Sequence, residues 1–360
     1  MKVLNVLCSG SAGGIESLCR SILINECNYE NHWMFIYQGG IVADSMKEQK
    51  KDEIIVLNEK RNIIKIILNI KKYCKKNRID IVTFHHSGLH NDMLYIISRI
   101  VLPKVKFVRY QHICYSTNKS LKDKLYDIIL NIEFKVSDLI IFVSEASKKS
   151  YEAKFKLKNN KKIVIYNGIG PEFYLNTDQK EKEDIFIYVG RLEEEKGVIL
   201  LLEAFKEFSK NNNRFKLIYV GDGTARHQLE RLVKKYKLSN KVEFLGRRLD
   251  VTKWLDMSKI FVYPSICEES FGISVVEAMA RGCIPVTFKK GGIPEIIENA
   301  HNGYIVEEVS ADALCNKLIE LDKNCNYKSI TKNALKTSKK FTIENTISEL
   351  EKNYLDLINK

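Results

Sequence analysis

Residues 259–288, "KIFVYPSICEESFGISVVEAMARGCIPVTF", contain two apolar runs rich in β-branched residues, separated by a helical pattern. The runs "KIFVYPS" and "CIPVTF" are typical of buried strands, and Pro264 is expected to end the first because proline cannot continue a central strand. Gly272 is expected to begin a helix that extends to about residue 281. A strand, a helix and a second strand in this order predict a right-handed crossover between parallel strands.

The same alternation of strands and helices continues on both sides of this stretch. In the second half of the chain we expect strands at 185–190, 215–221, 241–246, 259–265, 283–288 and 303–307, with helices near 197–210, 224–237, 250–257, 272–281 and 310–322. In the first half we expect strands at 2–8, 32–38, 53–58, 80–85, 105–110, 138–144 and 162–168, with helices near 14–27, 61–77, 90–101, 119–136 and 145–156. Strands separated by helices of this length predict two mostly parallel α/β sheets.

A change of composition marks the boundary between the two halves. Residues 167–184, "NGIGPEFYLNTDQKEKED", begin with glycine and proline and continue with charged residues that have little to bury. This segment is the expected linker, so we predict one domain over 1–170 and a second over 171–340. Residues 335–360 are predicted to form one amphipathic terminal helix, whose apolar side would carry Phe341, Ile343, Ile347, Leu350, Tyr354 and Leu357.

The composition is that of a globular protein with enough apolar material for two cores. Hydrophobic residues make up 45% of the 360 residues and charged residues 29%, which argues against a disordered chain. The formal net charge of +13 favours an anionic partner, such as nucleotide phosphate, acidic lipid or nucleic acid, although a lysine-rich genome would produce the same excess. Nine cysteines without a CxxC pair are typical of reduced thiols in a cytoplasm. No apolar run is long enough to span a membrane, so membrane contact would be peripheral.

Ligands of open α/β sheets bind where the carboxyl ends of the strands lead into loops and helices. After the first strand, Gly13 and Gly14 open a helix and would let an anion approach the backbone, although the full GxGxxG spacing is missing and glycines are also common in tight turns. After the first strand of the second half, Arg191 and Lys196 share one loop before a helix. This pattern favours a diphosphate, unless both side chains are merely solvated. Gly221 in "GDGTAR" either brings the backbone near a ligand or simply turns the chain.

Two glutamates surround the start of the helix in the opening stretch. Glu269 is expected in the loop, the backbone N–H groups of Phe271, Gly272 and Ile273 at the helix start, and Glu277 on the helix flank facing the same pocket. Glu269 could instead serve only the helix dipole, whereas a buried Glu277 without a partner would cost several kcal/mol. Cations that suit a diphosphate, beside carboxylates that accept from vicinal hydroxyls, indicate a nucleotide-sugar site.

These motifs together resemble those of the retaining glycosyltransferase family 4. The resemblance rests on "YPSICEESFGISVVEAMARGCIPV" (263–286) with "GRLEEEKG", "VGDG", "FLG" and "GGIPEII", and it thins in the first half to "GGIES", "VRYQH", "VSEASK" and "IYNGI". It implies the GT-B fold, in which two Rossmann-like, doubly wound parallel-sheet domains face each other across a cleft. It also implies that a C-terminal helix, residues 341–360, crosses back to the first domain.

The resemblance implies a role for each matching residue. Arg191 and Lys196 match the basic pair that holds the donor diphosphate and stabilises the leaving nucleotide. Glu277 matches the glutamate that binds the donor ribose, and Glu269 the one that lies beside the donor sugar. His112, at the end of the strand "KVKFVRYQH" (104–112), matches the histidine that faces the transferred sugar from the first domain.

The Gly13-Gly14 turn matches the glycine turn near the donor phosphates and the acceptor. The chain contains no Asp-any-Asp pair, which disfavours the metal-dependent type of glycosyltransferase. "FHHSGLH" offers His85, His86 and His90 as a metal cluster, but the first two would point in opposite directions on a strand and no cysteine or acid completes the ligand set. We therefore expect no metal and no cofactor besides the donor substrate.

The expected activity is retaining transfer of a hexose or an N-acetylhexosamine from a UDP- or GDP-sugar, with UDP preferred, to a hydroxyl of a saccharide or lipid-linked acceptor. The expected setting is bacterial cell-surface polysaccharide biosynthesis, in the cytoplasm, without nucleic acid. Residues 61–78, "RNIIKIILNIKKYCKKNR", combine apolar and basic residues and would allow peripheral contact with an anionic membrane at its inner face, unless they are only a solvated helix. A nucleotide-sugar epimerase of the same fold and a non-enzymatic basic membrane-binding protein remain the alternatives.

Overall fold

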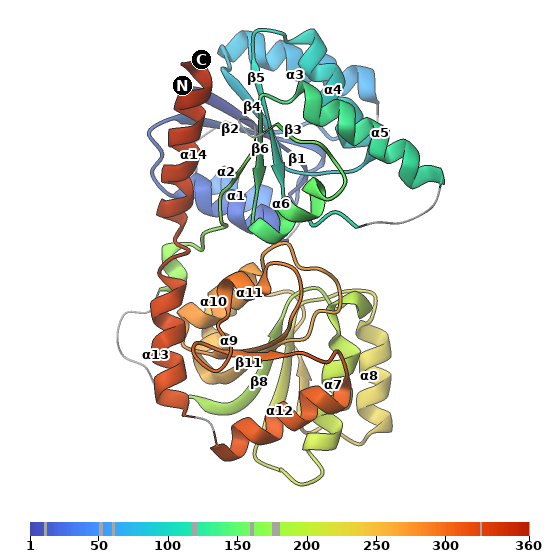
Figure 1. Cartoon of the computed structure of the whole chain (residues 1–360), viewed down its shortest axis with the longest axis vertical. Helices are drawn as coiled ribbons and strands as arrows, with labels where there is room; N and C mark the ends of the chain where they lie inside the picture. Colours follow the sequence, from blue (N-terminus) through green and yellow to red (C-terminus); the bar gives the residue numbers. More distant parts are fainter. Residues whose placement is uncertain are drawn as a thin grey trace. The chain divides into compact units, whose positions relative to one another are not determined.

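The computed structural model describes residues 1–10, 13–49, 53–59, 62–116, 121–158, 162–174, 181–324 and 326–359. The chain divides into two compact units, one formed by Met1–Gly170 with Ile343–Lys360 and the other by Pro171–Thr342. Each unit is an α/β structure around its own parallel sheet (Figure 1). The predicted fold class of two doubly wound parallel sheets is confirmed. Within the described residues, no helix is long and apolar enough to cross a membrane.

The sheet of the first unit has, among the described residues, seven parallel strands in the order β3-β2-β1-β4-β5-β6-β7. The strands are β1 (Lys2–Ser9), β2 (Glu30–Gln38), β3 (Glu53–Val56), β4 (Ile81–Phe84), β5 (Lys106–Gln111), β6 (Leu139–Phe142) and β7 (Lys162–Val164). The strand order reverses between β1 and β4, which are hydrogen-bonded neighbours. Ligands are therefore expected at the carboxyl ends of these two strands.

The helices of the first unit form two packed groups (Figure 1). One group contains α1 (Gly14–Ile24), α2 (Ile41–Gln49) and α14 (Ile343–Ile358), and the other contains α3 (Ile63–Asn77), α4 (Leu89–Val101) and α5 (Leu121–Val136); α6 (Glu145–Glu152) follows β6. Helix α3 begins at Asn62, whose side chain accepts a hydrogen bond from the Lys65 backbone N–H (3.1 Å), and its inner side buries Ile66 and Ile70 in the core. A capped amphipathic sequence thus explains this helix.

A buried ionic cluster ties α4 and α5 to the sheet. Arg109 on β5 contacts the carboxylates of Asp92 on α4 and Glu133 on α5, the latter with 2.8 Å between Arg109 Nε and Glu133 Oε1. All three side chains are 0% exposed. Burial alone would lower the pKa of Arg109, but the two carboxylates outweigh burial and raise it. The guanidinium therefore stays charged, and it neutralises acids that could not otherwise remain in the core.

The second unit has, within the described residues, six parallel strands in the order β10-β9-β8-β11-β12-β13. They are β8 (Glu183–Val189), β9 (Lys216–Val220), β10 (Val242–Phe244), β11 (Ser258–Tyr263), β12 (Ile284–Phe288) and β13 (Tyr304–Val306). The helices are α7 (Val198–Phe208), α8 (Arg226–Lys235), α9 (Val251–Met257), α10 (Ile273–Ala280), α11 (Ile293–Ile296), α12 (Ala311–Asn324) and α13 (Tyr327–Ser338). The order reverses between β8 and β11, whose carboxyl ends lead into the two loops with the strongest motifs.

The prediction of one continuous helix over 335–360 is wrong. Helix α13 ends at Ser338 and α14 begins at Ile343. Between them, Phe341 is buried and packs edge-on against Phe271, with ring centroids 5.4 Å apart, while the Ile343 backbone N–H donates to the Ile169 carbonyl (3.0 Å). The break exists because Phe341 belongs to the core of the second unit and Ile343 to that of the first.

Candidate active site

The loops at the carboxyl ends of β8, β9 and β11 meet through direct backbone contact. Gly197 has a φ of +68°, and a Cβ there would lie 1.9 Å from the Pro264 carbonyl oxygen. A Cβ on Gly221, with a φ of +136°, would lie 1.8 Å from the carbonyl oxygen of Gly190. Only glycine fits such positions. The close approach of neighbouring loops therefore accounts for Gly221, and its contact with a donor stays a prediction.

Two of the predicted site residues form a direct ion pair. Lys196, in the loop after β8, places Nζ 2.6 Å from Oε1 of Glu269, in the loop after β11, and the two side chains are only 13% and 9% exposed. Burial opposes the charge on Lys196, but the Glu269 carboxylate outweighs this effect and raises the pKa of Lys196. The pair thus holds a permanent cation at the switch point of the sheet.

Cys267 is a member of this site that sequence reasoning missed. Its Sγ lies 3.5 Å from Lys196 Nζ and 3.7 Å from Glu269 Oε1, and Ser265 Oγ lies 3.3 Å from the same sulfur. The thiol therefore helps to fix the lysine and glutamate side chains. The available signal was its place two residues before Glu269, on the same side of an extended loop.

The segment after β12 holds the Glu269 loop in place through hydrogen bonds. The Glu269 carbonyl accepts a hydrogen bond from the Gly292 backbone N–H (2.7 Å), and the Gly291 N–H donates to Glu268 Oε2 (2.6 Å). Gly291 has a φ of +51°, and a Cβ on it would lie 1.9 Å from the Glu269 carbonyl oxygen. Glycine is thus required at position 291, and the backbone N–H of Gly292 completes the contact with the Glu269 loop.

Arg191 lies on the open side of the same edge. Its side chain is 61% exposed and its Nη2 lies 2.8 Å from Oε1 of Glu195, four residues later. A shallow pocket of ≈ 340 Å³ lies beside this residue and is lined by Arg191, Glu193, Glu194, Glu195 and Thr224. Thr224 donates to Glu193 from both its hydroxyl and its backbone N–H, which lowers the pKa of Glu193. Arg191 thus has local carboxylates as counter-charges.

The start of α10 follows the predicted geometry. Pro264 follows the last residue of β11, Glu269 lies in the loop, and the helix begins directly after Gly272, whose φ is +98°. Phe271 is 1% exposed and anchors the loop against Phe341. Whether the backbone N–H groups of Phe271, Gly272 and Ile273 bind a donor stays a prediction.

Glu277 is the least compensated carboxylate of this region. It keeps part of its surface exposed, yet burial raises its pKa to about 7, and the nearby Glu172 carboxylate adds to this effect. No described residue donates a hydrogen bond to its carboxylate. An acid held in such surroundings at the carboxyl edge of a sheet is typical of a binding residue and not of a stabilising one.

Removing the charge of Glu277 is expected to stabilise the protein. Its pKa is about 7 in the folded chain against an ordinary 4.5, so the folded state binds the proton more tightly and the free energy of unfolding falls as pH rises through this interval. We expect Glu277→Gln to raise that free energy by about 2 kcal/mol at pH 8 and to leave it unchanged near pH 4. Urea unfolding at both pH values measures this. The exposed Glu243→Gln is the control, and equal gains from both variants would contradict the expectation.

The first unit also gathers polar residues at its switch point. Gly13 and Gly14 lie at the start of α1, and a Cβ on Gly13 would meet Glu16 Oε2 at 2.5 Å. Glu16 Oε1 lies 3.4 Å from Nε2 of His86, whose Nδ1 accepts a hydrogen bond from the Cys8 backbone N–H (3.3 Å). The Glu16–His86 contact was not predicted, since it joins the first turn of α1 to the loop after β4.

His112, which follows β5, belongs to a buried hydrogen-bonded chain. Asn5 Nδ2 donates to Asn31 Oδ1 (3.0 Å), so Asn5 Oδ1 accepts from His85 Nε2 (3.0 Å). Burial, followed by the charges of neighbouring groups, lowers the pKa of His85 to about 3, so its Nδ1 carries no proton and accepts from His112 Nε2 (3.1 Å). His112 is therefore held as the neutral tautomer protonated on Nε2.

Neither buried imidazole is expected to become charged near neutral pH. Burial lowers the pKa of His112 well below its ordinary value, and the neighbouring His85, His86 and Arg109 lower it further. Unfolded histidines bind protons below about pH 6.5, so the free energy of unfolding should fall as pH drops through that value. Imidazole ¹⁵N chemical shifts should show His85 and His112 neutral at about pH 5, with the 93% exposed His227 as reference. A His112 that protonates near pH 6.5 would contradict the tautomer assignment.

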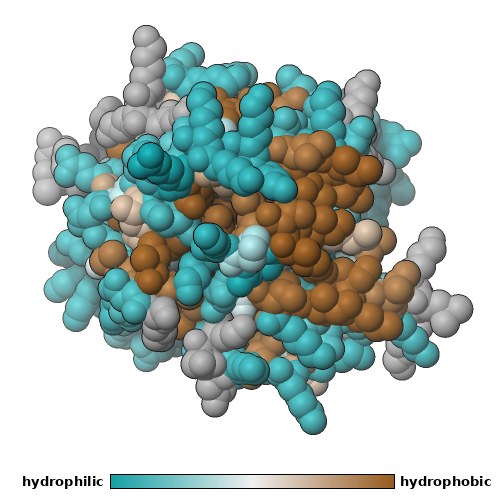
Figure 2. Space-filling model, turned by 90° about the horizontal axis from the view of Figure 1, so that it is seen from above, coloured by the Kyte–Doolittle hydropathy of each residue, from teal (hydrophilic) through white to brown (hydrophobic). Residues whose placement is uncertain are grey.

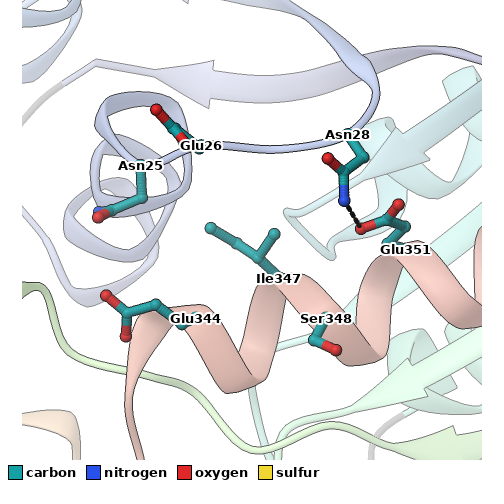
Figure 3. A pocket seen from close by; sticks show the side chains of 7 residues that line it. All are labelled: Asn25, Glu26, Asn28, Glu344, Ile347, Ser348 and Glu351. Atoms are coloured by element: carbon teal, nitrogen blue, oxygen red, sulfur yellow. Dashed lines mark hydrogen bonds between the residues drawn. The ribbon is translucent and has the colours of Figure 1, made fainter.

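A second pocket, of ≈ 410 Å³, lies elsewhere in the first unit and has the wrong charge for a phosphate. Figure 3 shows its lining by the turn before β2 and by α14, with Asn28 donating to Glu351 Oε2 (2.9 Å). Its other lining residues are Asn25, Glu26, Glu344, Ile347 and Ser348. It is near the amino end of β2, and its three carboxylates would repel an anion. The carboxyl edge of the second sheet therefore remains the candidate site.

Comparison with known proteins places this geometry in a family. Residues 175–337 match the family model "Glycosyl transferases group 1", and residues 46–173 match "Glycosyltransferase Family 4". Two uncharacterized glycosyltransferases of Methanocaldococcus jannaschii are 34% identical over 224 residues and 30% identical over 298 residues. The first match covers 61% of this chain and 60% of that protein, the second 75% and 71%.

A characterised relative and a solved structure are also similar. The N-acetyl-alpha-D-glucosaminyl L-malate synthase of Bacillus anthracis is 27% identical over 298 residues, covering 79% of this chain and 76% of that protein. The crystal structure of Anabaena HepE in complex with UDP and glucose has a TM-score of 0.84 at 19% identity, covering 98% of this chain and 99% of that one. The structural similarity supports the fold alone, and the sequence matches extend it to the family.

Proposed function

We propose that this chain, which belongs to the group 1 glycosyltransferases of family 4, transfers a hexose or an N-acetylhexosamine from a nucleoside diphosphate sugar to an acceptor hydroxyl with retention of configuration. The observation that carries the proposal is the buried Lys196–Glu269 ion pair at the β8–β11 switch point. Glu277 follows on the helix that this loop enters. Cation and carboxylates thus lie where an α/β sheet binds its ligand.

The donor diphosphate is assigned to Arg191 and Lys196. The two side chains differ in their surroundings, because Lys196 is fixed by Glu269 whereas Arg191 is exposed and pairs within its own loop. Lys196 therefore supplies a preorganised charge, and Arg191 one that moves to the phosphate from Glu195. A fixed cation stabilises charge that develops on the leaving diphosphate without reorganisation.

The ribose and the sugar are assigned to the two glutamates. Ribose hydroxyls would donate to the Glu277 carboxylate and so favour its ionised form, which burial disfavours. One carboxylate oxygen of Glu269 contacts Lys196. The remaining lone pairs of the carboxylate can accept a hydrogen bond from a sugar hydroxyl. The backbone N–H groups of Phe271, Gly272 and Ile273, and the Gly221 turn, complete the proposed donor site.

We assign to the first unit the binding of the acceptor and the contact with one face of the sugar. His112 would act as a neutral hydrogen-bonding group, since its lowered pKa keeps the imidazole uncharged near neutral pH and makes it a weak base. Gly13 and Gly14 would lie near the donor phosphates and the acceptor. These roles follow from the matching motifs and are supported by the position of each residue after β1 or β5.

The proposed reaction is a same-face displacement. The acceptor oxygen forms a bond to the anomeric carbon, the bond from that carbon to the diphosphate oxygen breaks, and the acceptor proton passes to the departing diphosphate. Arg191 and Lys196 stabilise the negative charge on the diphosphate, so no metal ion is invoked. UDP is proposed over GDP, with support from the UDP bound in HepE, and N-acetylhexosamine is supported by the name of the Bacillus relative.

The proposed acceptor is a saccharide or a lipid-linked saccharide in bacterial cell-surface polysaccharide biosynthesis. We place the protein in the cytoplasm, with peripheral contact between the basic first unit and the inner face of the membrane. The test is a panel of labelled UDP- and GDP-sugars offered with a lipid extract. Label transferred to a lipid or saccharide supports the proposal. Interconversion of nucleotide sugars without transfer would instead identify the epimerase alternative.

A further inference from the structure

Helices α3, α4 and α5 of the first unit pack in sequence and carry many exposed apolar side chains. Figure 2 shows a broad, continuous hydrophobic area on the face seen from above, bordered by hydrophilic side chains. The exposed large apolar residues that these helices contribute, among the described residues, are Ile64, Leu68, Leu89, Met93, Ile100, Leu125, Ile128 and Ile132. We call the outer surface of the three helices the α3–α5 face.

The spacing of these residues marks a second apolar side on each helix. On α5, Leu125, Ile128 and Ile132 follow helical periodicity and are 55%, 58% and 42% exposed. On α4, Met93 and Ile100 are 38% and 66% exposed and are separated by two turns. Single exposed apolar residues are ordinary, but a contiguous group of this size indicates a surface that something covers.

The charges of the α3–α5 face have one sign. The exposed charged side chains on these helices, within the described part of the chain, are lysines: Lys65, Lys72, Lys75, Lys76, Lys124 and Lys135. The acids of the same helices are buried or half-buried, namely Asp92, Asp123, Asp127 and Glu133. A partner that covers this face must therefore accept apolar side chains and offer negative charge.

An anionic lipid bilayer fits both requirements. Apolar side chains enter the boundary between headgroups and acyl chains, and lysines around them contact headgroup phosphates. A second copy of the chain fits less well, because a symmetric interface would bring the same lysines of two chains together.

We infer that the α3–α5 face is a docking surface for an anionic lipid bilayer, with Ile100 and Ile128 inserted and Lys72 and Lys75 on the headgroups. The inference deepens the proposed membrane contact by giving it a surface, and it rests on the proposed function only for the lipid-linked acceptor. Docking would hold the acceptor domain beside substrates that stay in the membrane. Vesicle binding itself needs neither donor nor transfer.

Co-sedimentation of the full chain with vesicles tests the surface. We expect binding to vesicles of phosphatidylglycerol and phosphatidylcholine that is at least tenfold stronger than to phosphatidylcholine alone and that weakens with salt. Ile100→Glu with Ile128→Glu should reduce binding by tenfold or more. Leu249→Glu, at a 73% exposed apolar residue of the second unit, is the matched control and should bind like the parent.

Charge reversal tests the contribution of the lysines to vesicle binding independently of the apolar residues. Lys72→Glu with Lys75→Glu should weaken binding by about tenfold or more, whereas Lys234→Glu with Lys235→Glu, also at the end of an exposed helix, should have little effect. Circular dichroism and thermal shift by UDP, recorded on every variant, separate loss of docking from unfolding and from failure of the donor site. Equal binding by parent and α3–α5 variants would overturn the inference. So would a concentration-dependent dimer, seen by ultracentrifugation, that Ile100→Glu with Ile128→Glu abolishes.

Discussion

Lys196→Ala is expected to lower the rate of sugar transfer by about 10³-fold. Lys196 is a buried cation fixed 2.6 Å from Glu269, so it stabilises charge on the leaving diphosphate without having to move. Its loss leaves the Glu269 carboxylate without this counter-charge beside the donor, which would add repulsion against the phosphates. Steady-state transfer of labelled sugar from the donor identified in the panel measures the effect.

The control is a lysine with a similar pair at the opposite end of a strand. Lys259 is the second residue of β11, at the amino end of the strand. It pairs with Asp184, and its side chain is 26% exposed. Lys259→Ala should change the stability of the second unit but leave transfer within about twofold. Lys196→Arg should restore only part of the activity, since a guanidinium does not replace an ammonium in a tight pair. Full activity of a folded Lys196→Ala protein would contradict the assigned role.

Arg109→Met is expected to destabilise the first unit by about 3–5 kcal/mol. The substitution leaves the carboxylates of Asp92 and Glu133 in the core without the cation that both contact. Protonation can relieve part of this cost, so the loss should be smaller at low pH. Urea unfolding followed by the fluorescence of Trp33, which is buried in the same unit, measures the effect.

A triple variant separates charge from packing. Arg109→Met with Asp92→Asn and Glu133→Gln removes all three formal charges, and it should recover a large part of the stability that Arg109→Met loses. Arg99→Met is the single-site control, because Arg99 is 23% exposed and its ion pair with Asp138 is partly solvated. A loss below about 1 kcal/mol for Arg109→Met would contradict the structural role of the cluster.

The strands and most helices could be predicted because their signals are local. The opening stretch illustrates this, since β11, α10 and β12 each have an apolar pattern and a proline or glycine at a boundary. Helix α2 was missed because the nine residues from Ile41 to Gln49 have a weak apolar period. The break at 339–342 was missed because Phe341 fits the helical pattern of the next segment, although its packing against Phe271 removes it from that helix.

The sequence predicted that Lys196 and Glu269 line the same pocket, but not that they form an ion pair. Sequence motifs placed each residue in the loop after a strand, but the ion pair itself depends on the strand order and on the backbone contact between Gly197 and Pro264. The hydrogen-bonded chain from Asn5 through His85 to His112 could not be predicted, because it joins β1 to residues that follow β4 and β5 and lie far away in the sequence. Contacts of this kind follow from strand order and register and leave no local pattern.

The loops after β8 and β11 are proposed to bind the nucleotide part of the donor. Amide hydrogen exchange of the full chain, with and without saturating UDP and separately GDP, tests it most directly. We expect slower exchange in residues 190–197 and 265–277 with one of the two nucleotides. Unchanged exchange in both loops, with protection instead around Asn25–Asn28 and α14, would contradict it.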